Sequence, residues 1–237
     1  KTSTLPKFCK KINSIDEINN YFTVNLTNRY DRVRVIGDIH GCYTALQQAI
    51  TPWDEKTLYI FCGDYLERGI ENKEMMYEMM HLSTLPNTIM LEGNHERHIA
   101  NFAFNTSLDR SKRFMKDVVA PIVKDMTKNE VESLQRELRL FYKSLRQCYP
   151  FSFHGKKYLV SHGGLSYVPN MTFIATSTFI NGFGAYETNI ANIYDTNYEK
   201  GMCQDFIQIH GHRGVPDGKF SFCLEGEVEF GGELKYI

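Results

Sequence analysis

Short apolar runs recur along this chain, and each of them ends in glycine and polar residues. The first run covers 33–36 and is rich in β-branched side chains. Later runs cover 58–62, 88–91, 158–160 and 206–209. Apolar runs of this length that are bounded by glycine are typical of buried strands. We therefore expect five strands in a layered, mixed α/β protein.

Helical periodicity follows the first two runs. Residues 43–50 form the predicted helix of a βαβ unit. Residues 71–82 carry methionines at helical spacing, and such a stripe favours a core face over a binding surface. The first part of the chain is therefore predicted to alternate strand and helix.

A longer interval without strand patterns extends from about 97 to 148. Within it, Thr127 and Glu130 have the spacing of a capping box, and apolar residues then step by three and four up to Leu145. We predict one domain spanning 1–237, with a mostly helical cap inserted at about 97–148. Lys and Arg outnumber Asp and Glu in this insertion. That excess fits either a solvated helix face or a surface that attracts an anionic substrate.

Three further segments have weaker patterns. Ser14 and Glu17 match a second capping box in a lead-in, residues 1–30, that we expect to be helical. Residues 165–201 are rich in Asn, Thr, Tyr and Gly and are predicted to form loops. Alternation around glycines in 220–236 predicts closing strands of a second sheet.

Composition limits the classes of partner and location. The 237 residues are 42% hydrophobic, which is enough for a full core, and the net charge of −1 gives no global basic field for nucleic acid. No apolar run approaches the roughly 18 residues that span a bilayer, and residues 1–11 lack the apolar part of a signal peptide. The six cysteines are scattered without a C-x-x-C pair, which favours buried thiols in a reducing setting. We expect a cytoplasmic protein with no membrane contact and no obligate protein partner.

Residues that can bind metal follow all five apolar runs. Asp38 and His40 are two apart in a locally extended chain, so their side chains leave on the same side. A carboxylate beside an imidazole is half of a divalent-metal site. Ligands of layered α/β proteins gather outside the carboxyl ends of the strands, so we expect one shared site. The later runs contribute Asp64, Asn94, His95, His162, His210 and His212.

Five blocks resemble the signature of the phosphoprotein-phosphatase (PPP) branch of the calcineurin-like metallophosphoesterases, in its compact bacterial or phage form. The blocks are GDIHG at 37–41, GDYLERG at 63–69, GNHE at 93–96, HGG at 162–164 and GH at 211–212. They occur in the family's order. The resemblance implies a four-layer αββα sandwich, two metals between its central sheets, and hydrolysis of phosphate esters by a metal-activated water.

The resemblance also implies which residues bind the metals. These are Asp38 and His40 for the first metal, Asn94, His162 and His212 for the second, and Asp64 as a bridge between them. Two divalent cations that share a hydroxide lower its pKa and stabilise both oxygens of an in-line displacement. Oxygen and nitrogen ligands without thiolate suit Mn²⁺, Fe or Zn²⁺, and we take Mn²⁺ as the expected metal.

The catalytic and substrate-binding residues follow from the same blocks. His95 looks like the general acid that protonates the leaving group, and Arg68 looks like a clamp on phosphate oxygens, a role that suits an arginine fork. Asn94 and His95 lie on the substrate side of the expected site. The residue expected to orient His95 is Glu67, where the family usually has Asp. Glu67 is one methylene longer, so we expect either a shifted geometry or weaker support of His95.

Several histidines and basic residues have no assigned role. His210 is expected to be a second-shell or packed histidine, and His81, His98 and His154 are expected to lie on the surface or in the core. Many family members have a second phosphate-binding arginine, but the segment 165–212 contains none. The candidates to replace it are Lys200, Arg213 and Arg97.

The expected function is hydrolysis of phosphomonoesters, with phosphoserine or phosphothreonine in proteins as the default substrate. The alternative is a nucleotide or RNA-end phosphoesterase, either a dinucleoside tetraphosphate hydrolase or an enzyme that heals 2′,3′-cyclic phosphate and 3′-phosphate ends. It is supported by a weaker resemblance to the phosphatase modules of bacterial RNA-repair systems, although Asn181 stands where a basic residue is expected. On that reading Glu225 is a second-shell carboxylate. The weaker resemblance rests on 181–187, 210–213, 224–226 and 229–232.

A third hypothesis is a non-catalytic binding module that keeps the fold. Glu67 and the missing arginine motivate it, whereas the full set of metal ligands argues against it. Nucleotide-binding motors are excluded because the chain has no G-x-x-x-x-G-K-[ST] motif.

Overall fold

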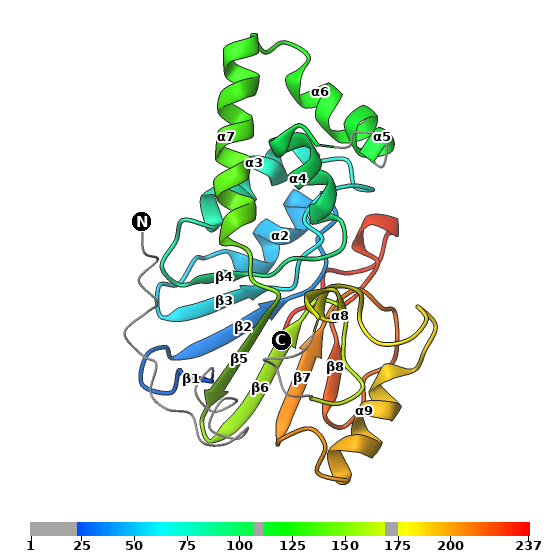
Figure 1. Cartoon of the computed structure of the whole chain (residues 1–237). Coiled ribbons are helices and arrows are strands. Elements are labelled where there is room, and N and C mark those ends of the chain that lie inside the picture. Colours follow the sequence, from blue (N-terminus) through cyan, green and yellow to red (C-terminus); the bar gives the residue numbers. More distant parts are fainter. Residues whose placement is uncertain (1–22, 107–110, 169–174) are drawn as a thin grey trace, which may run out of the picture.

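The computed structural model describes residues 23–106, 111–168 and 175–237. Two β-sheets pack face to face, and helices cover the outer side of each sheet (Figure 1). This is the four-layer αββα sandwich that the sequence motifs predicted. Across the described stretches, no helix has both the length and the apolar character that crossing a membrane requires.

The first sheet has three parallel strands whose carboxyl ends are in register. Ile36 pairs with Phe61, and Phe61 pairs with Met90. The residues that follow these three positions therefore emerge at one edge of the sheet. The strands are β2 (Arg32–Ile36), β3 (Thr57–Phe61) and β4 (Thr88–Met90).

The second sheet has five strands in the order β1-β5-β6-β7-β8. Only the β5–β6 pair is antiparallel. Ser161 pairs with His210, and His210 pairs with Cys223, so β6, β7 and β8 also end in register. The strands are β1 (Val24–Asn25), β5 (Cys148–Phe153), β6 (Lys156–Ser161), β7 (Phe206–His210) and β8 (Ser221–Cys223).

The alternation of side chains along β3 explains the layering. Leu58 and Ile60 pack between the sheets, against apolar residues of the five-stranded sheet. Tyr59 and Phe61 point to the opposite side, into the core beneath the helices. A strand that is covered on both faces needs an unbroken apolar run, which is the pattern at 58–62.

The helices of the two outer layers differ in number and length. The three-stranded sheet is covered by helices that include the methionine-rich α3, whose Met75, Met76, Met79 and Met80 are all buried as predicted. On the other side, the five-stranded sheet is covered by α8 and α9. The helices are α2 (Tyr43–Ile50), α3 (Asn72–Leu82), α4 (Glu96–Phe104), α7 (Lys128–Ser144), α8 (Thr176–Asn181) and α9 (Ile190–Glu199).

The interval between α4 and β5 is mostly helical in its described part. Its long helix α7 begins with the predicted capping box, in which the Thr127 amide donates to Glu130 Oε2 at 2.7 Å and the Glu130 amide donates to Thr127 Oγ1 at 3.4 Å. Short helical turns precede it at α5 (Lys112–Phe114), η2 (Met115–Val119) and α6 (Ala120–Val123). The interpretation of this interval as a cap inserted in a single domain stays a prediction.

The prediction of loops across 165–201 is wrong, because α8 and α9 lie in this interval. Ile190, Ala191 and Tyr194 form the buried stripe of α9, and the Tyr194 hydroxyl donates to the Phe206 carbonyl at 2.7 Å. The apolar face is only three residues long, and the Asn-rich remainder of the segment obscured it. Asn189 caps the helix by accepting from the Asn192 amide at 3.2 Å.

The ends of the chain also differ from the expectation. The second capping box, Ser14 and Glu17, lies outside the described residues, and the described end of the expected helical lead-in contains the strand β1 instead. In the tail, β8 joins the second sheet as predicted. However, Val228–Phe230 forms the 3-10 turn η3, and Tyr236 bridges to Ile36 of the other sheet.

Candidate active site

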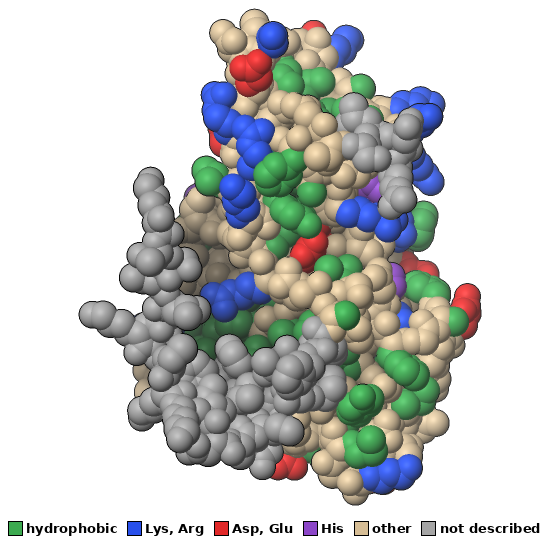
Figure 2. Space-filling view, viewed as in Figure 1, with side chains coloured by type: hydrophobic (Ala, Val, Ile, Leu, Met, Phe, Trp, Pro, Cys, Tyr) green, Lys and Arg blue, Asp and Glu red, His purple; other side chains and the backbone are tan. Residues whose placement is uncertain are grey.

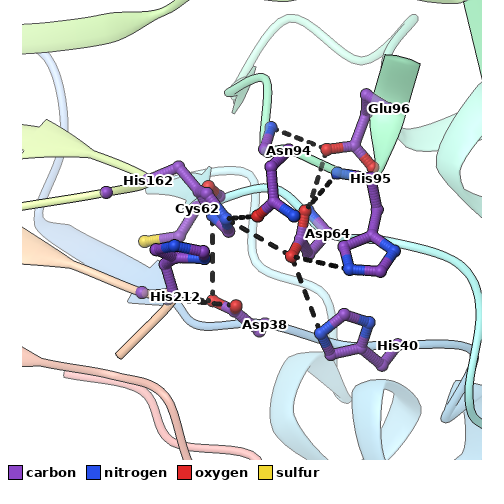
Figure 3. Close-up of polar contacts among 12 residues, drawn as sticks. Asp38, His40, Cys62, Asp64, Asn94, His95, Glu96, His162 and His212 are labelled. Atoms are coloured by element: carbon purple, nitrogen blue, oxygen red, sulfur yellow. Dashed lines mark hydrogen bonds and ion pairs between the residues drawn. The ribbon is translucent and has the colours of Figure 1, made fainter. Parts of the chain in front are cut away.

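The structure brings all six predicted metal ligands together at the edge where the two sheets end (Figure 3). Each ligand follows a strand within a few residues, so the in-register strand ends determine where the side chains converge. The six ligands are Asp38 and His40 after β2, Asp64 after β3, Asn94 after β4, His162 after β6 and His212 after β7.

Asp64 lies at the centre of this group. Its Oδ2 is 3.6 Å from His40 Nε2 and 3.3 Å from His162 Nε2. Burial alone would raise the pKa of Asp64, but His162, His95 and His40 together hold that pKa well below its ordinary value. One short carboxylate therefore faces both halves of the cluster, as a bridging ligand must.

Backbone carbonyls orient the two imidazoles that flank Asp64. The His162 Nδ1 lies 3.0 Å from the Cys62 carbonyl, and the His40 Nδ1 lies 3.4 Å from the Leu66 carbonyl. These contacts turn both Nε2 atoms toward Asp64. Metal-binding histidines are held in this way, with the other ring nitrogen on a carbonyl or carboxylate.

Asp38 occupies the opposite wall of the cluster. It is buried, and its carboxylate accepts from the His212 amide at 3.0 Å. A Cβ at position 211 would lie 1.9 Å from Asp38 Oδ1, so only glycine fits between the two ligands. Burial and then the neighbouring Glu225 raise the pKa of Asp38 well above its ordinary value. A cation beside Asp38 would remove this unfavourable interaction.

Several residues of the site have left-handed backbone conformations. His40, Asp64 and His212 have φ values of 46°, 52° and 66°, and Glu67 and Arg68 have values of 78° and 69°. Residues other than glycine rarely adopt positive φ, and such strain gathers at functional sites. The sharp turns after the strands aim these side chains into one space.

The predicted acid and its supporting carboxylate are in contact. His95 Nδ1 forms a hydrogen bond with Glu67 Oε2, and Arg68 Nη2 lies 3.3 Å from His95 Nε2. The Glu67 amide donates to Asn72 Oδ1 at 2.8 Å, which holds the turn that carries both Glu67 and Arg68. The extra methylene of Glu67 therefore does not prevent its contact with His95.

Sequence reasoning missed two residues beside this contact. His98 is buried as expected, yet its Nε2 lies 3.9 Å from Glu67 Oε2 and its Nδ1 lies 2.8 Å from Ser111 Oγ. Glu96 accepts from the amides of Asp64 and Gly93 at 2.9 Å and 2.6 Å. Burial and the nearby Asp64 charge raise the pKa of Glu96 to about 7. The sequence signals for Glu96 were its place at the end of the GNHE block and, as a carboxylate, in the first turn of α4.

His210 is packed rather than exposed to the site, as predicted. Its ring is fully buried against Gly164, and its Nδ1 lies 2.9 Å from the Gly211 carbonyl. Burial lowers the pKa of His210 to about 4, so the ring is neutral near pH 7. Of the other unassigned histidines, His81 and His154 are exposed.

Arg213 does not replace the missing phosphate-binding arginine. Its side chain is 1% exposed, and the guanidinium donates to the Gly163 carbonyl at 3.2 Å and to the Asn181 carbonyl at 3.1 Å, and also contacts the Ala185 carbonyl. Its donors therefore fasten the 181–185 segment beside His212 and are not available to a substrate.

Replacing Arg213 with Ala should lower the free energy of unfolding by roughly 3 kcal/mol, because buried carbonyls lose their donors. Urea unfolding measures this loss, with Arg136→Ala as the control, since Arg136 is exposed on α7. Equal stability of the two variants would contradict a structural role for Arg213.

A cavity of about 370 Å³ lies beside His95. Arg97 lines it together with Arg68 and Arg113, over the buried Phe114. Lys and Arg side chains also gather on the helical part at the top of the face shown in Figure 2. Of the three candidates for a second anion-binding residue, only Arg97 is thus in a position next to the acid.

The donor set fits divalent metals. The ligand atoms of Asp64, His162 and His212 lie within 4.8 Å of one another, as do those of Asp38, His40 and Glu225. The oxygen and nitrogen donors, without thiolate, suit Mn²⁺, Fe or Zn²⁺. The carboxylates of Asp38 and Asp64 are buried, and a buried negative charge is stable only beside a positive charge.

Metal affinity should fall as the pH falls. Burial lowers the pKa of His162, but Asp64, Glu96 and the Cys62 carbonyl together raise it by more, so that the net pKa lies above its ordinary value. A metal must displace this proton. Below that pKa, the metal affinity therefore falls by about tenfold per pH unit for each proton that is displaced. Calorimetric Mn²⁺ titrations at about pH 8 and about pH 6, in buffers of different ionisation enthalpy, measure both effects. Affinity that is independent of pH, without proton release, would argue against ligation by His162.

The profile of the calcineurin-like phosphoesterase family matches residues 31–233. Serine/threonine-protein phosphatase 2 of Salmonella typhimurium is 36% identical over 93 residues, or 38% of this chain, and the match spans only 40% of that protein. A structure described as a putative diadenosine tetraphosphatase has a TM-score of 0.59 at 18% identity, with 90% of this chain and 91% of that chain covered. A Saccharomyces cerevisiae protein serine/threonine phosphatase structure has a TM-score of 0.46 at 20% identity, with coverage of 84% and 69%.

Proposed function

The chain belongs to the calcineurin-like phosphoesterase family, as its resemblance to the phosphoprotein-phosphatase branch predicted, and we propose that it is a dinuclear-metal phosphatase acting on phosphomonoesters. The observation that carries the proposal is the convergence on Asp64. His40 approaches it from one side and His162 from the other, and His95 lies 3.9 Å from the same oxygen. A two-metal site with an adjacent acid is the arrangement that phosphate-ester hydrolysis needs.

The residues that would hold the metals are those named in the sequence. Asp38 and His40 would hold the first cation, Asn94, His162 and His212 would hold the second, and Asp64 would be shared between them. When bound, the cations supply Lewis-acid charge and an acidified water nucleophile. The proposed metal is Mn²⁺, with Fe or Zn²⁺ as the alternatives.

The remaining steps belong to side chains of this chain. Arg68 binds phosphate oxygens with its guanidinium, on a side chain that is 39% exposed. His95 gives a proton from Nε2 to the leaving oxygen, because its Nδ1 is engaged by Glu67. Glu67 fixes the ring orientation and favours the protonated imidazole, since its hydrogen bond raises the pKa of His95 against the opposing effect of burial. Asn94 is a neutral ligand and adds no negative charge to the site.

The proposed substrates are phosphoserine and phosphothreonine in proteins. The sequence similarity to a serine/threonine-protein phosphatase supports this choice, although it covers a minority of both chains. The second candidate is a nucleotide or RNA-end phosphoester. It is supported by the cavity beside His95, which Arg97 and Arg113 line together with the proposed acid. Arginine forks match the further phosphates that a nucleotide leaving group carries.

A competition assay separates the two candidates. The Mn²⁺-loaded protein is given p-nitrophenyl phosphate together with a phosphoserine peptide, diadenosine tetraphosphate or a nucleoside 2′,3′-cyclic phosphate. Release of p-nitrophenolate is followed, and the product of each competitor (dephosphorylated peptide, mononucleotides or ring-opened nucleoside monophosphate) is quantified by chromatography. The peptide should be turned over with the highest kcat/KM. A higher kcat/KM for either nucleotide would transfer the proposal to that class. Binding of all three substrates without turnover would favour the non-catalytic module.

The location remains a prediction. A cytoplasmic setting fits the cysteines, since Cys62, Cys203 and Cys223 are buried free thiols in the described part of the chain. Burial raises the pKa of the Cys62 thiol well above its ordinary value, so the thiol is neutral and unreactive.

A further inference from the structure

Arg68 already has a buried carboxylate partner. Its Nη1 donates to Glu229 Oε1 at 2.9 Å, across 161 positions of sequence. The Glu229 side chain is 1% exposed, whereas the Arg68 side chain is 39% exposed. The Arg68 guanidinium, which we propose as the phosphate clamp, is thus ion-paired with a carboxylate that solvent does not reach.

In the turn that carries Glu229, the carboxylate is buried while a neighbouring aromatic side chain is exposed, which is the reverse of the usual arrangement. None of the residues of η3 is buried as a whole, and the neighbouring Phe230 is 73% exposed. Glu227 and Gly231 bracket the turn with left-handed φ values of 51° and 92°. An exposed aromatic beside an inward carboxylate adds nothing to a hydrophobic core, so folding alone does not account for the conformation.

The other oxygen of Glu229 has no hydrogen-bond partner among the described residues. Glu229 Oε2 is buried and has no hydrogen bond within the described chain, while Oε1 lies 3.9 Å from His40 Nε2. Buried carboxylate oxygens without partners are rare, because their desolvation is unfavourable. The carboxylate that is ion-paired with Arg68 thus lies next to the place where we propose that a substrate phosphate binds.

We propose that Glu229 is a specificity-determining residue that reduces the preference of the site for dianionic phosphomonoesters over monoanionic phosphodiesters. The inference rests on the proposed function and deepens it. A monoester brings two negative charges to Arg68 at neutral pH, whereas a diester brings one. The fixed charge of Glu229 repels the dianion about twice as strongly, because Coulomb repulsion is proportional to the charge. Phosphodiesters thereby remain competitive substrates of the same site.

The test compares Glu229→Gln with the parent, both loaded with Mn²⁺. The ratio of kcat/KM for p-nitrophenyl phosphate to kcat/KM for bis(p-nitrophenyl) phosphate should rise by roughly tenfold, since the amide keeps the shape and loses the charge. The matched control is Glu227→Gln, an exposed carboxylate of the same segment, and its ratio should stay at the parent value. An unchanged ratio in Glu229→Gln, or an equal loss toward both substrates, would overturn the inference and leave Glu229 as a positioning residue for Arg68.

Calorimetry with inorganic phosphate makes the test independent of turnover. At about pH 8 phosphate is a dianion, and its affinity for the Mn²⁺-loaded protein should rise by roughly tenfold in Glu229→Gln. Metal content is measured on the same samples. Equal phosphate affinity at equal metal content would overturn the inference. If the parent binds phosphate but hydrolyses neither ester, the proposed function fails while the role of Glu229 is still tested.

Discussion

Asp64→Asn should reduce Mn²⁺-dependent phosphate release by on the order of 10³-fold or more. The carboxylate faces both His40 and His162, and an amide supplies one neutral oxygen where two cations need a shared anion. Loss of several kcal/mol of transition-state stabilisation corresponds to this factor. The measurement is kcat/KM for p-nitrophenyl phosphate, together with the Mn²⁺ content of each protein.

Asp31→Asn is the matched control, because Asp31 is 70% exposed and lies outside the site. It makes the same chemical change and should keep parental activity and metal content. The bridging role would be contradicted if Asp64→Asn bound two Mn²⁺ ions with parental affinity and kept its turnover.

His95→Asn should impair hydrolysis according to the leaving group. Alkyl phosphates such as phosphoserine need a proton on the departing oxygen, so their kcat should fall by roughly 10²–10⁴-fold. p-Nitrophenolate is a stable anion that departs without protonation, so the kcat for p-nitrophenyl phosphate should fall much less. Glu67→Gln should give the same pattern to a smaller degree, because the amide still orients the His95 ring but does not stabilise its charge.

The dependence on the leaving group separates acid catalysis from a loss of structure. His81→Asn provides the control, since His81 is exposed on α3 and its replacement should affect neither substrate. An equal reduction toward both substrates in His95→Asn would assign His95 to binding or folding instead of proton transfer.

The strand ends and the metal ligands that follow them could be predicted because both depend on the local sequence pattern. A buried parallel strand has an unbroken apolar run, and ligands gather after its carboxyl end. Asp64 and His162 each follow such a run, so their approach did not depend on unknown loop conformations. The capping box of Thr127 is a local rule of the same kind.

The contacts that sequence reasoning missed join segments without such a rule. Glu229 meets Arg68 across 161 positions, through a turn that is held by left-handed residues. His98 reaches Glu67 only because α4 packs beside the loop after β3. Arg213 was a candidate for binding phosphate because its charge is visible in the sequence, whereas its burial among carbonyls is not.

Helix α9 is an element that hydrophobic periodicity alone does not predict. Its buried stripe of Ile190, Ala191 and Tyr194 is set in a polar, Asn-rich sequence with little amphipathic signal. The helix is stabilised by its packing on the five-stranded sheet, where Tyr194 contacts the strand β7. Tertiary packing therefore outweighed the weak local preference for loops.

The central claim of two catalytic metals is tested most directly by titrating Mn²⁺ into chelator-treated protein while following p-nitrophenyl phosphate hydrolysis. The proposed site predicts no turnover without metal, and turnover that rises with occupancy until two ions are bound per chain. Full activity after chelation, or full activity with a single bound ion, would contradict it.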